Sequence, residues 1–381
     1  MIESRFLQVH TLTSYPGALL NRDDAGLAKR LPFGGTVRAR ISSQCQKRRW
    51  RTAGDDPWAL ARVGVPMGSR TKEIVERVIL PKARAQVPAN DDVARAVEEV
   101  FIKHLYGEKA SDTRNRQALF FGQPEIDYLS DKAGEALAKG DAKEAGEAAE
   151  RFFANERQNL RALKNGAGLE AALFGRMVTS DPAANTDAAI HVAHAITVHE
   201  IERELDFMTA VDDLKGPESG DDAGAAGMFD MELASGLYYG YVVVDVPLLV
   251  ENLAGDRETA AKVVAHLLHL IAQVSPGAKK GSTAPYAWAE FVLVEAGTRQ
   301  PRTLANAFRE PIDLRRKGNR LCDEAVERIA AHLEKLDGAY GAHEARRVLN
   351  VSDAAVASAE PLDLDRLADW ATQAVCAGTV Q

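Results

Sequence analysis

The chain has 381 residues, of which 46% are hydrophobic and 6% aromatic, and its formal net charge is −8. This length predicts two or three structural units with enough apolar residues for a sizeable core. The absence of an eighteen-residue apolar run and of a signal-peptide pattern in MIESRFLQVH argues against a membrane or secreted protein. Three scattered cysteines without a CxxC motif fit a reduced cytoplasmic protein.

The distribution of charge is more informative than its sum. An acidic total argues against a nucleic-acid ligand only when the charge is spread evenly. Residues 25–51 contain no acidic residue, and most of the acidic excess follows residue 200. This segment therefore predicts a local site for an anionic ligand. Its eight basic residues are Lys29, Arg30, Arg38, Arg40, Lys47, Arg48, Arg49 and Arg51.

The first elements along the chain are predicted strands. Residues 5–13 alternate between apolar and polar side chains, as do residues 36–41. In the second strand, Arg38 and Arg40 fall on one side, which predicts a half-buried strand with a cationic outer face. Ser42 and Ser43 are plausible N-caps for a helix over residues 44–53.

The middle and end of the chain change texture. Helical spacing dominates residues 56–180, which predicts a helical insertion. Strand-like segments then bracket a Gly-rich acidic stretch at 211–229, which predicts a hairpin with a loose tip. An α+β fold assembled from discontinuous segments follows from this alternation. The other predicted elements are helices at 71–80, 91–106, 130–139, 141–163, 169–177, 257–273, 322–336 and 364–377, and strands at 187–201 and 288–296.

The segment ISSQCQKRRWR at 41–51 carries the strongest chemical signal. Hydroxyls, amides and free N–H groups at a helix N-terminus suit phosphate oxygens. Lys47 and Arg51 are four residues apart and share a helix face. The alternative is an ordinary solvated helix with a Ser cap. In LNRDD at 20–24, Arg22 either faces phosphate or belongs to a salt-bridged turn.

Other polar residues give weaker signals. The Gly-rich loop at 276–285, with Lys279 and Lys280, lets backbone N–H groups approach an anion but is not a P-loop. His266 and His269 could meet on a helix, but no third metal ligand is evident. No GxSxG, HExxH or GxGxxG motif occurs. We therefore predict no enzyme activity, no metal and no cofactor.

The order of these motifs resembles the CasC family, the Cascade backbone subunit of type I-E CRISPR systems. The motifs are LNRDD, FGG, RISSQ…K…R, ALFGRM, DFMTAVDDL and the late Gly-rich loop, and they run from residue 5 to about residue 295. The resemblance implies a modified RNA-recognition-motif (ferredoxin-like) palm from residues 1–55, 181–200 and 236–381. It also implies helical fingers at 56–180 and a β-hairpin thumb at 201–235.

The same resemblance implies a function. Family members cut nothing and bind no catalytic metal. Several copies stack along the spacer of the CRISPR RNA and present its bases for pairing with the target DNA strand in antiviral defence. The implied partners are CRISPR RNA, the target DNA strand, neighbouring copies, and the Cascade subunits CasA, CasB, CasD and CasE.

The resemblance also implies residue roles. Some relatives carry an aromatic residue at the position of Met208, where this chain has a flexible thioether that can fill the same gap. The implied guide contacts are Arg22, Lys29, Ser42, Gln44, Lys47 and Arg51. The implied base wedge and thumb residues are Met177, Phe207, Met208 and Thr209, and the possible target-DNA contacts are Lys132, Lys139 and Lys143. By its pattern alone, Met177 is a core residue.

Three alternatives remain open at this point. A metal-independent ribonuclease would need a general base, and His10 is the histidine nearest the basic segment. A backbone subunit of type III character would cut target RNA with Asp206, Asp212 or Asp213. A general RNA chaperone would show no regular spacing of binding sites.

Overall fold

The computed structural model describes residues 2–155, 168–176, 185–211, 225–277, 279–315, 318 and 320–380. The chain forms two compact units. Unit 1 comprises residues 1–60, 191–246 and 260–381, and unit 2 comprises residues 61–190 and 247–259. In the described residues, no helix combines the length and apolarity that crossing a bilayer requires.

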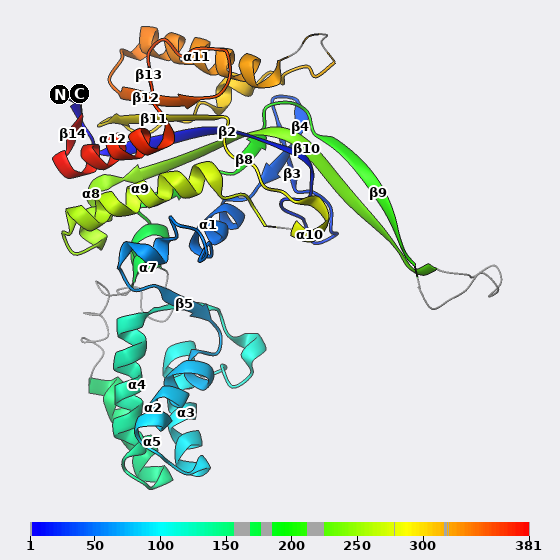
Figure 1. Cartoon of the computed structure of the whole chain (residues 1–381). Coiled ribbons are helices and arrows are strands. Elements are labelled where there is room, and N and C mark those ends of the chain that lie inside the picture. The colour runs from blue at the N-terminus through cyan, green and yellow to red at the C-terminus, as the bar shows by residue number, and fades with distance from the viewer. Residues whose placement is uncertain are drawn as a thin grey trace. The chain divides into compact units, whose positions relative to one another are not determined.

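Unit 1 is built on a ten-stranded, mostly antiparallel sheet (Figure 1). Strands β12 and β13 run parallel, and the pairs along the rest of the path are antiparallel. Near the termini, β1 (Ile2–Glu3) pairs with β14 (Thr379–Val380). In order across the sheet, the strands are β13 (Glu360–Pro361), β12 (Ala345–Asn350), β11 (Phe291–Gly297), β2 (Phe6–Ala18), β10 (Ala225–Asp245), β8 (Ala195–Thr197), β4 (Thr36–Ile41) and β3 (Arg30–Phe33), with β7 (Ile190–Val192) and β9 (Glu202–Val211) also paired to β10.

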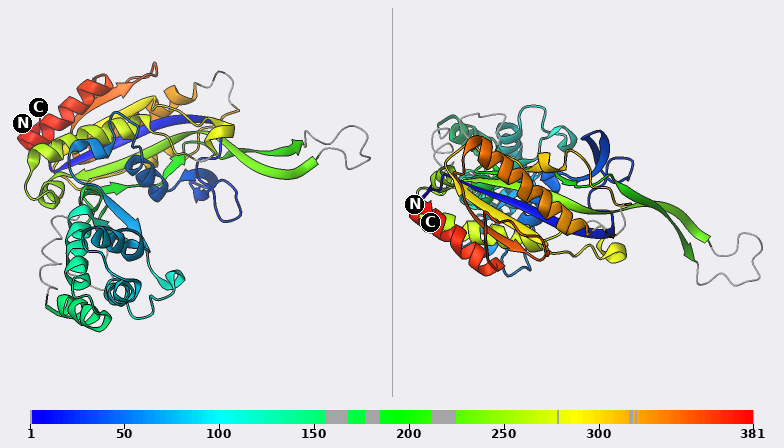
Figure 2. Two further views of the ribbon diagram at one scale, coloured as in Figure 1. Left: turned by 60° about the horizontal axis from the view of Figure 1, so that its bottom comes forward. Right: turned by 90° about the horizontal axis from the view of Figure 1, so that it is seen from above.

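Helices cover both faces of this sheet. Successive strand residues point to opposite faces, and Tyr238 and Tyr239 of β10 show which helix lies where. Tyr239 packs in a core cluster with Val326 of α11 (Leu321–Tyr340), whereas Tyr238 packs with Cys45 of α1 (Ser43–Arg51). We call these the α11 face and the α1 face. Helix α9 lies on the α1 face, and Figure 2 shows α11 crossing the other.

Many predicted elements are confirmed. The helices expected at 257–273 and 364–377 are α9 (Arg257–Gln273) and α12 (Leu364–Ala377), and the strand expected at 36–41 is β4. Ser42 is the N-cap of α1. The single strand expected at 187–201 is wrong, because β7 and β8 are separate short strands.

The predicted cationic outer face of β4 is wrong at Arg38. This guanidinium is fully buried and donates hydrogen bonds to Thr36 Oγ1 (2.9 Å), Thr197 O (2.9 Å) and Phe308 O (2.8 Å). The 3-10 helix η7 (Ala305–Phe308) covers this side of the strand, and its terminal carbonyl needs a donor. Val37, predicted to face inward, is 40% exposed.

The hairpin predicted in 201–235 is present. Strands β9 and β10 pair antiparallel from Glu202↔Ser235 to Val211↔Ala225. Strand β10 has 21 residues and continues into the sheet, where Gly236 to Asp245 pair with β2. The same strand therefore forms half of the hairpin and the middle of the sheet (Figure 2).

Unit 2 is mainly helical. Helix α5, expected to be polar on most faces, buries Ala145, Ala149 and Phe153 at four-residue spacing, so one stripe joins the core. Helix α4 begins earlier than predicted because Pro124 occupies its first turn and Glu125 Oε2 accepts a hydrogen bond from the Gly122 N–H at the N-cap, at 3.1 Å. The helices are α2 (Leu80–Gln86), α3 (Asp91–Tyr106), α4 (Gln123–Leu137), α5 (Ala142–Asn155), α7 (Leu169–Phe174) and, at the edge of the division, α8 (Val246–Asn252); β5 (Gly68–Thr71) pairs with β6 (Leu119–Gly122).

Candidate nucleic-acid interface

The N-terminus of α1 is tied firmly to its surroundings. Ser42 Oγ accepts a hydrogen bond from the Cys45 N–H at 3.3 Å, as an N-cap should. The Ser42 N–H donates to Asn21 Oδ1 at 2.9 Å, and the Ser43 N–H donates to His194 Nδ1 at 3.0 Å. The loop at 20–29 and the link between β7 and β8 therefore meet at this helix end.

These hydrogen bonds correct one prediction. We expected free N–H groups at this helix terminus to contact phosphate, but those of Ser42, Ser43 and Cys45 already have acceptors within the chain. Ser42 is also only 6% exposed. Phosphate contacts at this end of α1 then have to come mainly from side chains.

The LNRDD loop is a folded turn organised by Asp23. Asp23 Oδ1 accepts hydrogen bonds from the N–H groups of Ala25 and Leu27, both at 2.9 Å. Arg22 forms a backbone bridge with Ala28, and its side chain is exposed. Across the described part of the chain Arg22 makes no ion pair, so the salt-bridged alternative is not supported.

Lys29, Arg40 and His194 gather beside the start of α1. The Arg40 N–H donates to Lys29 O at 2.8 Å. Burial, and then the charges of Arg40 and Lys29, lower the pKa of His194. Arg40 Nε is buried and has no hydrogen-bond partner within the described residues. An unsatisfied buried donor costs on the order of 1–3 kcal/mol. The Arg40 side chain is only half-buried, so a small shift would let this Nε reach an outside acceptor such as a phosphate oxygen.

The body of α1 carries the remaining predicted contacts. Lys47 and Arg51 are half-buried and share one helix face, whereas Gln44 and Arg48 are exposed. Cations in the last turn also suit the helix dipole, so Arg48 fits the reading of an ordinary solvated helix equally well. The guide-contact roles of Gln44, Lys47 and Arg51 stay predictions.

The Gly-rich loop lies against α1. Arg49 Nε donates to Ser275 O at 3.0 Å, just before the loop. A Cβ on Gly277 would lie 3.0 Å from Lys280 Cε and 3.7 Å from Arg49 Nε, so a glycine allows this close approach. The fold thus brings together two basic segments that are more than two hundred residues apart in the chain.

Two exposed aromatic side chains complete this surface, and neither was predicted as a site residue from the sequence. Tyr286 is 69% exposed and Trp288 is 71% exposed. Lys280 Nζ lies 6.0 Å from the centroid of the Tyr286 ring. The pattern YAW at 286–288 directly follows the Lys-containing Gly-rich loop. Because it leads into the buried strand β11, the sequence alone does not show that Tyr286 and Trp288 face solvent.

The hairpin residues are described in part. Phe207 on β9 is 61% exposed, and Asp206 lies opposite Met231. The role implied for Phe207 stays a prediction. The side chains of Met208 and Thr209, and the whole of Met177, Asp212 and Asp213, lie outside the described residues.

The three lysines predicted to touch target DNA differ from one another. Lys132 Nζ pairs with Glu135 at 2.8 Å and lies 5.7 Å from the centroid of the Tyr128 ring. Lys139 and Lys143 are exposed. The intramolecular ion pair makes Lys132 the weakest of the three candidates, and the assignment stays a prediction.

His10 belongs to a buried network in unit 1. Its Nδ1 lies 2.8 Å from Tyr239 Oη and its Nε2 lies 3.0 Å from Glu295 Oε2. Arg302 and Arg346 also bind Glu295, each at 2.7 Å. Burial lowers the pKa of His10. A ring with no exposed surface cannot reach a 2′-hydroxyl in this conformation, which disfavours His10 as a ribonuclease base.

The histidine pair expected on α9 meets an aromatic ring. The His269 ring stacks on Trp58 with centroids 3.7 Å apart, and His266 Nδ1 lies 3.0 Å from Trp58 O. Burial lowers the pKa of His269, and the nearby charge of Asp365 opposes this shift only in part. Within the described ranges, no group of three His, Cys, Asp or Glu residues is placed to hold a metal ion.

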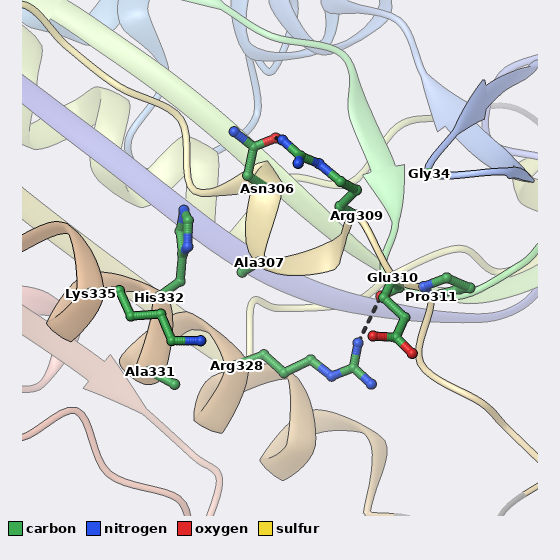
Figure 3. Close-up of a pocket in the computed structure, with 10 residues that line it drawn as sticks. All are labelled: Gly34, Asn306, Ala307, Arg309, Glu310, Pro311, Arg328, Ala331, His332 and Lys335. Carbon is green, nitrogen blue, oxygen red and sulfur yellow. Dashed lines mark hydrogen bonds between the residues drawn. The ribbon is translucent and has the colours of Figure 1, made fainter.

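A basic pocket lies on the α11 face, with a volume of about 670 Å³ (Figure 3). Burial, followed by the nearby charges of Lys335, Arg302 and Arg309, lowers the pKa of His332 here. Arg328 is already paired with Glu324 at 2.7 Å. The other residues lining this pocket are Gly34, Asn306, Ala307, Glu310, Pro311 and Ala331.

The FGG turn forms one edge of this pocket, where Gly34 is a lining residue. Gly34 has a φ of +63°, and a Cβ at this position would lie 1.6 Å from Arg309 O. Both the left-handed backbone and the close approach to η7 therefore require glycine. This motif thus has a packing role, which is independent of any ligand.

This chain is similar to known proteins both in sequence and in fold. A family model described as "CT1975-like protein" matches residues 7–373. A solved chain described as "CRISPR RNA-guided surveillance complex, pre-nicking" is 26% identical with a TM-score of 0.77, covering 96% of this chain and 100% of that one. Another, described as "CRISPR RNA-guided surveillance complex", is 23% identical with a TM-score of 0.69, covering 96% and 99%, and shows likeness of fold. No sequence among the curated proteins matches.

Proposed function

We propose that this chain, which belongs to the CT1975-like protein family, holds the guide RNA of a Cascade-type CRISPR surveillance complex by its phosphates. Family membership and the match to surveillance-complex structures support a role in such an assembly. The finer assignment to the type I-E CasC backbone subunit rests on the motif series LNRDD, FGG, RISSQ and ALFGRM.

The observation that carries this proposal is the concentration of cations around α1 in a protein whose net charge is −8. Arg22 is exposed without an ion pair in the described residues, and Arg40 has a buried Nε in need of an acceptor. Lys47 and Arg51 share one helix face nearby. A local positive surface on an acidic body binds a strand while limiting nonspecific attachment elsewhere.

Holding a guide by its backbone suits the task. Phosphate contacts carry no sequence information, so any guide fits and its base edges stay open for pairing. Each phosphate neutralised on a single strand steepens the dependence of log K on log salt by about 0.7. In this proposal Arg22, Lys29, Gln44, Lys47 and Arg51 provide these contacts, and Arg40 joins them.

The proposal extends to assembly. Several copies would follow the spacer of the CRISPR RNA, and the β9–β10 hairpin would reach over the strand held by a neighbouring copy, with Phe207 beside a displaced base. The sheet of unit 1 would serve as the RNA-recognition-motif-like palm. Lys139 and Lys143 would contact the target DNA strand, and the subunits CasA, CasB, CasD and CasE would complete the complex. The chain would act as a non-enzymatic scaffold.

A direct test expresses the full chain with a repeat–spacer transcript and separates the product by size exclusion. We expect a large species with a high 260/280 nm absorbance ratio, whose RNA resists nuclease at regular intervals. The bound RNA should also remain uncut with and without Mg²⁺, as a scaffold requires.

Three outcomes would contradict the proposal. A chain that ignores single-stranded RNA even at low salt would remove the phosphate-binding role. Mg²⁺-dependent cleavage that disappears in Asp206→Ala would replace the scaffold with a nuclease. Irregular protection along the RNA would favour the general chaperone.

A further inference from the structure

The segment at 285–289 is a rigid strap between the Gly-rich loop and β11. The Ser275 hydroxyl accepts from the Ala287 N–H and donates to the Ala287 carbonyl, each at 2.9 Å. The Ala289 N–H donates to Ala272 O at 2.7 Å. Pro285 and Ala289 are buried, and Ala287 is half-buried between them. Odd-numbered positions thus anchor the strap to unit 1.

The even-numbered positions of this strap are aromatic and exposed. Tyr286 and Trp288 have 69% and 71% of their surface in solvent. The alternation of buried and exposed positions over 285–289 indicates that these two side chains lie on the same, solvent-facing side. In a fully extended chain, residues two apart are about 6.6 Å apart along the chain. Stacked bases rise by about 3.4 Å, so two rings at twice this spacing leave room for one base between them.

The two rings are not stacked on each other. Among the described residues, the aromatic contacts include no contact between Tyr286 and Trp288. Two large, solvent-exposed aromatic rings would gain free energy by covering a flat partner. A nucleobase offers such a partner on both faces.

The surroundings favour nucleic acid over a protein partner. Lys280 lies beside the Tyr286 ring, and Arg49 of α1 is held to Ser275 at the base of the strap. The preceding segment is rich in Lys, Gly, Ser and Thr. The core of a protein interface is instead apolar and poor in charge. Aromatic rings flanked by cations are typical of surfaces that bind single strands.

We propose that Tyr286 and Trp288 hold one unpaired nucleobase of the bound strand between their rings, while Lys280 contacts an adjoining phosphate. This inference rests on the proposed function, because it requires a strand to pass along α1. It adds a base contact to a site otherwise made of phosphate contacts. The base held here is withdrawn from pairing with a target.

The test measures binding of a short single-stranded RNA to the full chain at several salt concentrations. Tyr286→Ala with Trp288→Ala should weaken binding by about five- to hundredfold, the range expected when one stacked base is lost. The slope of log K against log salt should not change, because no phosphate contact is removed. Trp288→Phe should retain most of the affinity.

Two controls make the result specific. Tyr340→Ala removes an aromatic side chain that is equally exposed, at 71%, at the end of α11, and it should not change binding. An abasic oligomer of ribose phosphate should bind the wild type and the double variant equally. Intrinsic fluorescence gives a direct signal, since Trp288 is the most exposed of the four tryptophans and a stacked base should quench it.

The outcomes separate this inference from the proposed function. If the wild type binds RNA with a steep salt dependence and the double variant binds equally well, stacking is wrong and phosphate binding survives. If the double variant instead loses self-association without RNA, the rings form a protein contact and the inference is overturned. If the wild type binds no RNA, both proposals fail.

Discussion

Helix α1 and the pocket beside α11 are both basic, but their cations are differently engaged. In the pocket, Arg328 is paired with Glu324, and Glu310 lies in the lining. Residues 25–51 contain no acid. Arg30 of this segment pairs with Glu232 at 3.4 Å, but in the described part of the chain Arg22 makes no ion pair and Arg40 Nε has no acceptor. The contrast shows that the number of basic residues does not identify a nucleic-acid surface. The absence of nearby acids and the presence of hydrogen-bonding groups without partners are better indicators.

The sharpest way to break this comparison is charge reversal on α1. Lys47→Glu with Arg51→Glu should lower affinity for single-stranded RNA by a hundredfold or more, since each charge-assisted contact contributes about 1.5–3 kcal/mol. The salt slope should also fall by about 1.4 for two lost phosphate contacts. Fluorescence anisotropy across a salt series measures both quantities.

A matched control reverses the same number of charges in the pocket. Arg309→Glu with Lys335→Glu changes two exposed cations on the α11 face. RNA affinity and salt slope should stay within about twofold of the wild type, allowing for long-range repulsion that salt screens. Equal losses in both double variants would mean that net charge, and not α1, determines binding.

Arg38 tests the opposite case, a cation whose role is internal. Arg38→Met leaves two buried carbonyls and a threonine hydroxyl without this donor. We expect the free energy of unfolding to fall by about 2–4 kcal/mol. Urea titration at pH 7 measures this loss. A variant as stable as the wild type would show that the buried hydrogen bonds of Arg38 contribute nothing net.

Arg40, two residues further along β4, should behave differently. Arg40→Met should weaken RNA binding by about tenfold through loss of one charge-assisted contact, and Arg40→Lys should restore part of it. Stability should stay the same or rise in Arg40→Met, since Nε has no partner to lose in the described residues and its unsatisfied burial is removed. A variant that loses stability but binds RNA normally would show that Arg40, like Arg38, has a structural role and no RNA contact.

The smallest effect concerns pH. Burial lowers the pKa of His10, so below pH 6.5 the unfolded chain takes up a proton that the folded chain excludes. Stability should therefore fall as the pH decreases from 7 to 5.5, by at most about 1.4 kcal/mol per pH unit for one proton. His10→Gln should make this decrease shallower. Urea titrations at both pH values test it, and equal slopes would contradict it.

Glu295, the partner of His10, should not confuse this measurement. Burial alone would raise the pKa of Glu295, but hydrogen bonds from His10 and Arg302 outweigh it and hold the pKa far below the usual range. A carboxylate of this kind contributes stability above its ordinary pKa of 4.5 and loses it only as the pH falls further. Between pH 7 and 5.5 it stays ionised.

Local chemistry made much of the fold predictable. Helix α9 and α12 match their predicted bounds because apolar spacing and end signals agree. The prediction that Arg38 is exposed was wrong, because strand alternation shows only which side chains share a face. It cannot show that η7, more than 260 residues later in the chain, covers that face. The same limit separates Arg38 from Arg40, which the sequence presents as equivalent.

The candidate site was predictable to the extent that charge segregation reveals it. Loop 20–29 and α1 are close in sequence and lie together in the structure, but long-range contacts had to bring the Gly-rich loop to Arg49. The exposure of Tyr286 and Trp288 depends on how Ser275 anchors the strap between them. Such a contact leaves no periodic trace in the sequence.

One strand gives the hairpin an unusual mechanical position. From Gly236 to Asp245, β10 is held by β2, and near Tyr238 also by β8; from Ala225 to Ser235, its partner is mainly β9. A force applied to the tip of the β9–β10 hairpin is therefore transmitted along β10 into the sheet of unit 1. Amide hydrogen exchange should accordingly change stepwise within this single strand, fast beyond Ser235 and slow inside the sheet. A nucleic-acid strand bound across residues 225–235 would slow exchange in this part of β10 and leave residues 236–245 unchanged.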